Sequence, residues 1–333
     1  MNIGVALPTT EIGNNRADIR DFVRAIEDMG YDYLTCIDHV IQGPKPLADD
    51  WRDYYTLQNP FHEVLVLFGY IAALTERLGL ATSVMIAPQR PTVLMAKQLA
   101  EIDVLSGGRM RTGIGIGWNA LEYDALGQNF KTRARRMEEQ IDLLRKLWSQ
   151  ARVTFKGEWD TVNDTGINPL PVQRPIPIWI GGAAAPAIRR AGRLADGFFL
   201  GARLKPGAQS AEKITIFHDA AHEAGRDPTT LGLDTTIFTE RRGGNELHEE
   251  FEAWRDLGAT HVTVRTMACG YTTVSEHLKA FEEARKALSD DCSIRFNGDT
   301  KTANSPHQTC PLQNNAIQIC RCSRLASAAT NRF

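Results

Sequence analysis

Residues 80–117 read LATSVMIAPQRPTVLMAKQLAEIDVLSGGRMRTGIGIG, and this stretch decides the fold. Residues 80–87 form a short apolar run, as expected of a buried strand. Residues 91–106 begin with a proline and end before two glycines, which are typical start and stop signals of a helix. Residues 109–117 then return to a short apolar run. The order strand, helix, strand predicts a parallel βαβ unit.

The same alternation continues on both sides of this unit. Thr273, with Glu276 three residues later, forms a capping box that predicts the start of the last helix. Eight strand–helix units in about 290 residues predict a (β/α)₈ TIM barrel. The alternative is an open doubly wound sheet, which needs a Gly-rich turn directly after its first strand, where this chain has LPTTEIGNN. The other predicted strands are 2–8, 31–37, 176–182, 196–202, 231–240 and 260–266, and the other helices are 16–29, 61–77, 131–149, 184–194, 208–224 and 245–257.

Two segments depart from this rhythm. Residues 151–176, with VTFKGEWDTV and NPLPVQRP, predict a hairpin and a proline-rich connection inserted after the fourth helix. In residues 289–333 the apolar residues follow neither the spacing of a helix nor the alternation of a strand. We therefore expect one barrel domain over 1–288 and a disordered or non-native tail. His307 and Cys310 lie near a CRC triplet, but their spacing fits no zinc pattern, and no metal site is predicted.

Composition excludes several classes of function. The net charge of the 333 residues is −2 without a basic stripe, which argues against nucleic acid or an anionic membrane as a partner. The longest apolar stretch, 61–74, carries His62 and Glu63 and is too short to span a bilayer. The N-terminus lacks the pattern of a signal peptide. The six cysteines form no disulfide framework, so we expect a cytoplasmic protein.

The active site of such a barrel lies at the C-terminal ends of its strands. Asp38 and His39 follow the second strand, and a histidine can give or take a proton near neutral pH. We therefore predict His39 as a catalytic residue that Asp38 orients or charges. The remaining strand ends are polar, glycine-rich and partly cationic: Pro8-Thr9, Pro88-Gln89-Arg90, Gly117-Trp118-Asn119, Gly181-Gly182, Ala202-Arg203, Glu240-Arg241 and Arg265-Thr266.

Two glycine-rich stretches allow a functional and a structural interpretation. GIGIG (113–117) either lets a flat ligand approach the backbone or forms a tight strand in a crowded barrel. The glycines of IWIGGAAAPAIRRAG (178–192) lead from a strand into a helix, which makes an anion site or a plain turn. Arg203 and Arg265 could bind an anionic substrate or cofactor tail, and Trp118 could stack on a ring or plug the barrel.

Together these residues resemble the luciferase-like monooxygenase superfamily, and within it the branch that uses the deazaflavin coenzyme F-420. The motif IDHV (37–40) and the blocks 81–127 and 169–199 carry the resemblance, which spans about residues 1–288. It implies a reduced flavin-type cofactor in the barrel mouth and a homodimer, for whose contact the apolar helix at 61–77 is a candidate.

The resemblance also implies roles for single residues. Asp38 matches the acid that contacts the cofactor ring, and His39 matches the active-site base or proton relay. A cis peptide bond between Ser83 and Val84 would form a bulge behind the ring. The remaining cofactor contacts fall on the fourth strand and on the start of the helix that holds the phosphate: Ile116, Gly117, Gly181, Gly182, Ala184 and Ala185.

One departure bears on the substrate. Sugar-phosphate dehydrogenases of this branch have a glutamate proton donor just after the glycine of strand four, where this chain has Trp118. Glu122 lies four residues further on and is a candidate substitute. We therefore expect a small, apolar or aromatic substrate in place of a sugar phosphate, with Trp118, Glu122, Arg203 and Arg265 as candidate contacts.

Three functions remain open at this level. The first is hydride transfer between coenzyme F-420 and a small organic molecule. The second is an FMN-dependent monooxygenase that uses reduced flavin and oxygen. The third is a non-catalytic barrel that stores or carries a flavin. In the first two, the loop after strand three and the insertion at 151–176 would cover the site and exclude water.

Overall fold

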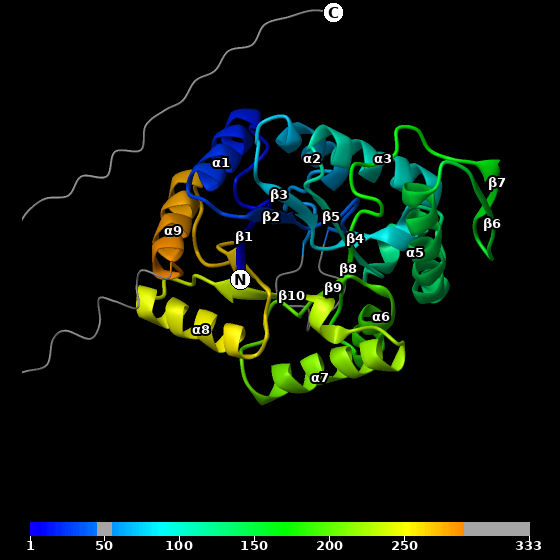
Figure 1. Cartoon of the computed structure of the whole chain (residues 1–333). Helices are drawn as coiled ribbons and strands as arrows, with labels where there is room; N and C mark the ends of the chain where they lie inside the picture. Colours follow the sequence, from blue (N-terminus) through cyan, green and yellow to red (C-terminus); the bar gives the residue numbers. More distant parts are fainter. Residues whose placement is uncertain (45–54, 290–333) are drawn as a thin grey trace, which may run out of the picture. The chain divides into compact units, whose positions relative to one another are not determined.

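The computed structural model describes residues 1–44 and 55–289, and their strands close into a parallel barrel (Figure 1). Each neighbouring pair is parallel, and the ring is closed where Leu80 and Ala81 pair with Met110 and Arg111. Nine strands take part, but β3 and β4 share one position, which leaves the eight positions of a TIM barrel. The strands are β1 (Asn2–Ala6), β2 (Tyr33–Cys36), β3 (Gly79–Thr82), β4 (Met85–Ile86), β5 (Met110–Gly115), β8 (Ile178–Gly181), β9 (Gly197–Phe199), β10 (Gly232–Phe238) and β11 (His261–Arg265).

The predicted strand 80–87 is interrupted in the structure, and its two parts, β3 and β4, occupy one position of the barrel. The chain pairs with β5 before and after the break, through Leu80 and Ala81 in β3 and through Met85 and Ile86 in β4. The peptide bond between Ser83 and Val84, at the break, is cis, as the resemblance implies. Ser83 and Val84, on the two sides of this bond, both line the cavity inside the barrel.

Helices surround the barrel because each buries one apolar stripe against it. In α1, for example, Ile19, Phe22, Val23 and Ile26 are all buried. The last helix begins at the predicted capping box of Thr273 and Glu276. The helices are α1 (Arg16–Asp28), α2 (Val64–Ala72), α3 (Thr92–Leu105), α4 (Ala120–Ala125), α5 (Arg133–Ser149), α6 (Ala185–Leu194), α7 (Ala208–Glu223), α8 (Gly244–Asp256) and α9 (Val274–Ala287), with 3₁₀ turns at Ala87–Gln89, Phe130–Thr132 and Pro228–Thr230.

Two helices differ from the prediction. The helix expected at 61–77 is shorter, because Glu63 caps α2 by accepting the N–H of Val66 at 2.7 Å. The short helix α4 was not predicted, and Asn119 caps it by accepting the N–H of Leu121 at 3.1 Å. No described helix is long and apolar enough to cross a membrane. The predicted tail lies outside the described residues, apart from Ser289.

The insertion forms an antiparallel hairpin of β6 (Val153–Lys156) and β7 (Thr161–Thr165), which projects beside α5 (Figure 1). The Glu139 carboxylate of α5 accepts the N–H groups of residues 158, 159 and 160. Thr92 at the start of α3 donates a hydrogen bond to Asp160. None of residues 151–176 lines the central cavity, so the expectation that this insertion covers the site is wrong.

The N-terminal end of the barrel is filled by a buried ionic cluster. The guanidinium of Arg111 lies 4.3 Å from the ring centre of Tyr33 and 4.4 Å from that of Trp179. It also pairs with the buried Asp234 at 3.1 Å, and Asp234 accepts further hydrogen bonds from Tyr33 and Thr263. A buried charge needs such partners. The cluster therefore separates the interior of the barrel from the solvent at the N-terminal end.

Candidate active site

A cavity of about 670 Å³ opens at the C-terminal ends of the strands, within the usual size range of small-molecule sites. Two predicted site residues are not among those that line it. Ala185 is the first residue of α6, directly after the lining residue Ala184, and Arg203 is an exposed side chain on the loop after β9. The predicted residues that do line the cavity are Asp38, His39, Ser83, Val84, Ile116, Gly117, Trp118, Glu122, Gly181, Gly182, Ala184 and Arg265.

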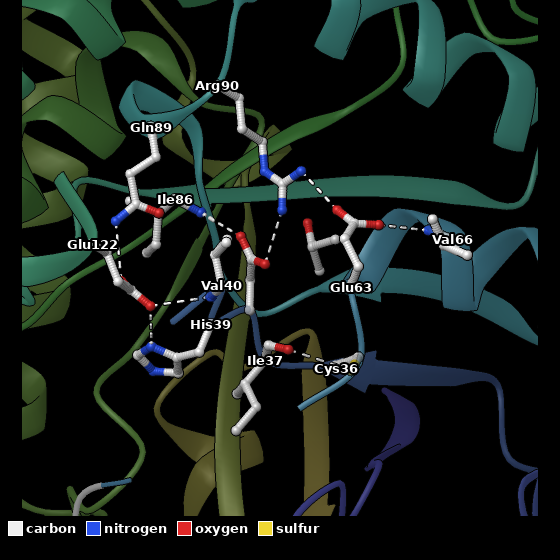
Figure 2. A network of polar contacts seen from close by, with 12 residues as sticks. Cys36, Ile37, His39, Val40, Glu63, Val66, Ile86, Gln89, Arg90 and Glu122 are labelled. Atoms are coloured by element: carbon white, nitrogen blue, oxygen red, sulfur yellow. Dashed lines mark hydrogen bonds and ion pairs between the residues drawn. The ribbon is translucent and has the colours of Figure 1, made fainter. Parts of the chain in front are cut away.

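His39 is held by Glu122, a residue from α4 (Figure 2). Nδ1 of His39 lies 2.9 Å from Oε1 of Glu122, which also accepts the N–H of Val40 at 3.1 Å. Gln89 donates to the other carboxylate oxygen at 3.0 Å. An ionised carboxylate only accepts, so Nδ1 carries a proton and Nε2 is the nitrogen that remains for exchange with a ligand.

The environment of Glu122 favours its ionised form. Burial alone would raise the pKa of this carboxyl group, but the hydrogen bonds and charge of His39, with those of Gln89 and Val40, hold it below the usual value. The His39 side chain is only 9% exposed. Its ring lies 5.0 Å from the rings of Tyr55 and Phe61 and 5.7 Å from that of Trp118. This aromatic surrounding restricts the access of water to the imidazole.

Asp38 does not contact His39 through its side chain, so the prediction that it orients or charges the imidazole is wrong. Its carboxylate pairs with Arg90 at 2.9 Å and accepts the N–H of Ile86 at 3.1 Å. Arg90 also reaches Glu63 at 2.7 Å (Figure 2). Burial raises the pKa of Asp38 above its usual value, against the opposing effect of Arg90. Adjacent residues of an extended chain point in opposite directions, which explains the separate partners.

The wall formed by β4 and β5 is shaped by close contacts between side chains and glycines. A Cβ atom on Gly115 or on Gly181 would lie 2.6 Å from a methyl group of Val84. A Cβ atom on Gly117 would lie 2.8 Å from a methyl group of Ile86. The interpretation of GIGIG as a tight strand is therefore confirmed for this packing. The glycines let Val84 and Ile86 stand as an apolar surface at the cavity wall.

The start of α6 provides an uncapped helix end beside this wall. Gly181 ends β8, and Gly182 and Ala184 lead into the helix and line the cavity. The capping residue Ala184 has no side-chain acceptor for the first N–H groups. Pro186 has no N–H, and the N–H of Ala187 already donates to the carbonyl of Ala184 at 2.9 Å, so the N–H of Ala185 is the one that remains for a ligand in this first turn. Lys213 donates to the carbonyl of Ala183 at 2.9 Å. The N–H of Ala185 and the helix dipole favour an anion at this position. The chemistry of this end of the cavity fits a phosphate group.

Sequence reasoning missed several residues that line the cavity. Arg90 was recognised only as part of a strand end, although it pairs with Asp38. The polar residues Asp234 and Thr236 of β10 and Thr263 of β11 also line it. Their signal was present, because residues two apart in a strand point to the same face. Polar residues at that spacing in 231–240 and 260–266 indicate a polar face inside the barrel.

The chain belongs to the luciferase-like monooxygenase family, whose model matches residues 1–301. The predictions of this family and of a TIM barrel are confirmed.

Relatives with named cofactors fall into two groups. An F420-dependent glucose-6-phosphate dehydrogenase of Microbacterium testaceum is 29% identical over 71% of this chain and 67% of its own length. An FMNH(2)-dependent dimethylsulfone monooxygenase of Pseudomonas putida is 36% identical over 41% of this chain and 39% of its own length. An uncharacterized protein of Mycobacterium tuberculosis is 34% identical over 54% of this chain, and the alignment spans 63% of that relative.

Solved structures agree with the fold. A monooxygenase of Streptomyces bottropensis has a TM-score of 0.71 at 18% identity, covering 86% of this chain and 98% of that one. An F420-dependent secondary alcohol dehydrogenase, solved with an F420-acetone adduct, has a TM-score of 0.70 at 18% identity, covering 87% and 99%. At this identity the likeness supports the barrel and does not transfer a substrate.

Proposed function

We propose that this protein is an oxidoreductase that transfers hydride between coenzyme F-420 and a small organic substrate. The observation that carries the proposal is His39, held through Nδ1 by Glu122 at the wall of a cavity that also contains an uncapped helix end. The relative named as F420-dependent aligns over a larger share of this chain than the one named as FMNH(2)-dependent, which favours the deazaflavin.

The residues fit such a cofactor in three places. The first turn of α6, with Gly181, Gly182, Ala184 and Ala185, would hold its phosphate. Ser83, Val84, Ile116 and Gly117 would support the ring along the wall of β4 and β5. Asp38, paired with Arg90, would contact the ring at the end of the second strand. When bound, the deazaflavin supplies the two-electron hydride chemistry.

Residues of the chain would then transfer the proton that accompanies the hydride. A substrate carbonyl that receives a hydride must also gain a proton on oxygen, and in the reverse direction an alcohol must lose one. Nε2 of His39 would supply or accept that proton. Glu122 would keep the imidazole in one tautomer and stabilise its charged form. Trp118 and Tyr55 would help exclude water from the reacting atoms.

The test is a fluorescence titration of the purified protein with coenzyme F-420 and with FMN, each oxidised and reduced. We expect micromolar binding of the deazaflavin and weak binding of FMN. In His39→Ala, binding should persist while turnover is lost. Binding of neither compound would contradict the proposal and the assigned roles of Gly117, Gly181 and Gly182.

The second candidate is an FMN-dependent monooxygenase, which the dimethylsulfone monooxygenase relative favours. Tight FMN binding in the same titration would support it, and activity should then require oxygen and a flavin reductase. Binding without turnover over a wide range of carbonyl and alcohol substrates would instead support a non-catalytic flavin carrier.

We also propose that the protein is a cytoplasmic homodimer. The cysteine usage favours a reducing compartment, because both described cysteines, Cys36 and Cys269, are free thiols. Exposed apolar side chains on α2 and α3 favour a contact between copies, since such patches mark interaction sites. They are Val66, which is 73% exposed, together with Val93, Leu94 and Leu105.

Light scattering after size exclusion tests the dimer. Val66→Glu should convert it to a monomer, whereas Lys279→Glu on α9 serves as an exposed control and should not. A wild-type protein that is monomeric at micromolar concentration would contradict the proposed contact.

A further inference from the structure

Each carboxylate that lines the cavity has a basic partner within the chain, whereas one guanidinium that lines it has no carboxylate partner among the described residues. The carboxylate of Asp38 is paired with Arg90, that of Glu122 with His39, and that of Asp234 with Arg111. Arg265 is the other charged residue among the lining residues. Its guanidinium has no hydrogen bond or ion pair with any part of the chain that the structure describes.

The surroundings of Arg265 provide packing but no acceptor. Arg265 ends β11, and its guanidinium lies 5.5 Å from the ring centre of Phe238. Its Nε is buried and has no hydrogen-bond partner. A buried donor without an acceptor is unfavourable, and a partly buried charge adds to that cost unless a counter-charge approaches it. The neighbouring lining residues Thr263 and Met267 provide no such charge. Glu240 and Arg265 both act electrostatically on the thiol of Cys269, but no ion pair joins them in the described part of the chain.

The order of the strands separates Arg265 from the proposed phosphate end. Going round the barrel, β9 and β10 lie between β8, which leads into α6, and β11, which ends at Arg265. In the other direction only β1 lies between β11 and β2, which leads to His39. Arg265 and the start of α6 therefore stand at different positions around the cavity, and Arg265 lies on the side nearer to the strand that leads to His39.

We propose that Arg265 binds a carboxylate of the substrate, so that the substrate is an apolar molecule with a single anionic end. The inference rests on the proposed function, because it assigns the space between Arg265 and His39 to the substrate. A guanidinium and a carboxylate form a strong, planar, charge-assisted pair. The apolar body of the molecule would contact Leu7, Phe199 and Met267, which line the same cavity.

Arg203 offers a matched control within the same chain. Its guanidinium lies 5.6 Å from the same Phe238 ring, yet the side chain is exposed and does not line the cavity. A loss of positive charge at Arg203 changes the field around the mouth but removes no group from the cavity. A comparison of the two arginines therefore separates direct binding from general electrostatic attraction.

Calorimetric titration of the protein saturated with coenzyme F-420 tests the proposal with two matched pairs of probes. These are benzoate with benzamide, and hexanoate with hexanamide. Wild type and Arg203→Gln should bind the anion of at least one pair at least tenfold more tightly than its amide. Arg265→Gln should lose this preference, and Arg265→Lys should retain part of it because the charge remains. The Kd for F-420 should change less than about twofold in all variants.

Three results would overturn the proposal. The first is a wild type that does not prefer the anion of either pair. The second is an Arg265→Gln variant with an unfolding temperature like that of wild type and an unchanged preference. The third is a tenfold weaker binding of F-420 in Arg265→Gln, which would place Arg265 in the cofactor site. Failure of wild type to bind F-420 or FMN would instead contradict the proposed function, and the same probe pairs would then be titrated into the cofactor-free protein to decide the role of Arg265.

Discussion

The imidazole of His39 owes its position to a carboxylate that lies 83 residues further along the chain. Glu122 receives hydrogen bonds from His39, Gln89 and the N–H of Val40, and its side chain is only 1% exposed. Its charge is therefore stabilised by protein donors with little help from water. A change at this residue should affect the proton chemistry of His39 more than the shape of the cavity.

Glu122→Gln tests this view. The amide keeps the size of the side chain but cannot stabilise an imidazolium, so kcat should fall by about 10–100-fold. The Kd for the cofactor should remain the same, because the other cavity residues are unchanged. Steady-state kinetics with fluorescence titration measures both values, and an unchanged kcat would show that His39 does not exchange the proton.

The same variant has an expected effect on stability. Because the pKa of Glu122 in the folded protein is held below its usual value of 4.5, its ionised form stabilises the fold above that pH. This contribution is lost as the pH falls through the lowered pKa. The difference in unfolding free energy between wild type and Glu122→Gln should therefore be largest near neutral pH and shrink below pH 4.5, as urea titrations at several pH values can measure.

Arg90→Met tests the pair with Asp38. The Asp38 side chain has no exposed surface, so removal of its partner leaves a buried charge, and stability should fall by about 3–5 kcal/mol. Because burial already raises the pKa of Asp38, the folded variant binds a proton more readily than the unfolded chain, and the loss should shrink as the pH falls. In Arg90→Met/Asp38→Asn a large part of the stability should return, and its failure to do so would assign the loss to the packing of Arg90.

Single residues of the site were predictable from the sequence, but their partners were not. The alternation of strand and helix patterns predicted that Asp38 and His39 lie at one strand end and Arg265 at another. All three line the cavity. The pairs Asp38–Arg90 and His39–Glu122 join residues from different loops. Such contacts depend on side-chain directions at the strand ends, which no local pattern encodes.

At the scale of elements, the break between β3 and β4 depends on glycines in neighbouring strands. Gly115→Ala places a Cβ atom 2.6 Å from a methyl group of Val84, and the resulting overpacking should cost about 1–3 kcal/mol. Val84→Ala removes that methyl group, so the double variant should show a favourable coupling between the two sites in a double-mutant cycle of urea unfolding. Additive losses would show that Val84 does not set the requirement for glycine.

Substitutions at two other glycines, one more crowded and one less crowded than Gly115, serve as controls for that experiment. In Gly113→Ala the new Cβ atom would lie 1.8 Å from the backbone oxygen of Thr82, so no side-chain truncation should rescue it. In Gly69→Ala, within α2, the new Cβ atom meets nothing within 4 Å, and stability should rise by up to about 1 kcal/mol. The three substitutions together distinguish crowding from a general effect of glycine replacement.

Most helices and strands could be predicted from the spacing of apolar residues and from capping residues. The capping box at Thr273 marked the start of α9 correctly. The predicted strand 80–87 is continuous in its pattern, and only the packing against β5 shows where it divides. The helix α4 has six residues, which is too short for a periodic pattern to reveal.

At the scale of the whole molecule, we propose that the folded enzyme ends just after α9, at its C-capping residue Leu288. The family model extends thirteen residues further, to residue 301, so the boundary needs a direct test. A chain that stops after Leu288 should keep the cofactor Kd, the activity and the unfolding temperature of the full chain. A drop in unfolding temperature of more than about 4 °C, or a loss of activity, would show that residues beyond Leu288 belong to the domain.

The ionic cluster around Arg111 has a consequence for the order in which reactants enter and leave. Because it fills the N-terminal end of the barrel, cofactor and substrate must use the same route through the mouth. A cofactor seated along β4 and β5 would then be covered by the substrate that follows it. Initial-rate and product-inhibition patterns should therefore show compulsory order, with the cofactor first to enter and last to leave, and a random-order pattern would imply a second route.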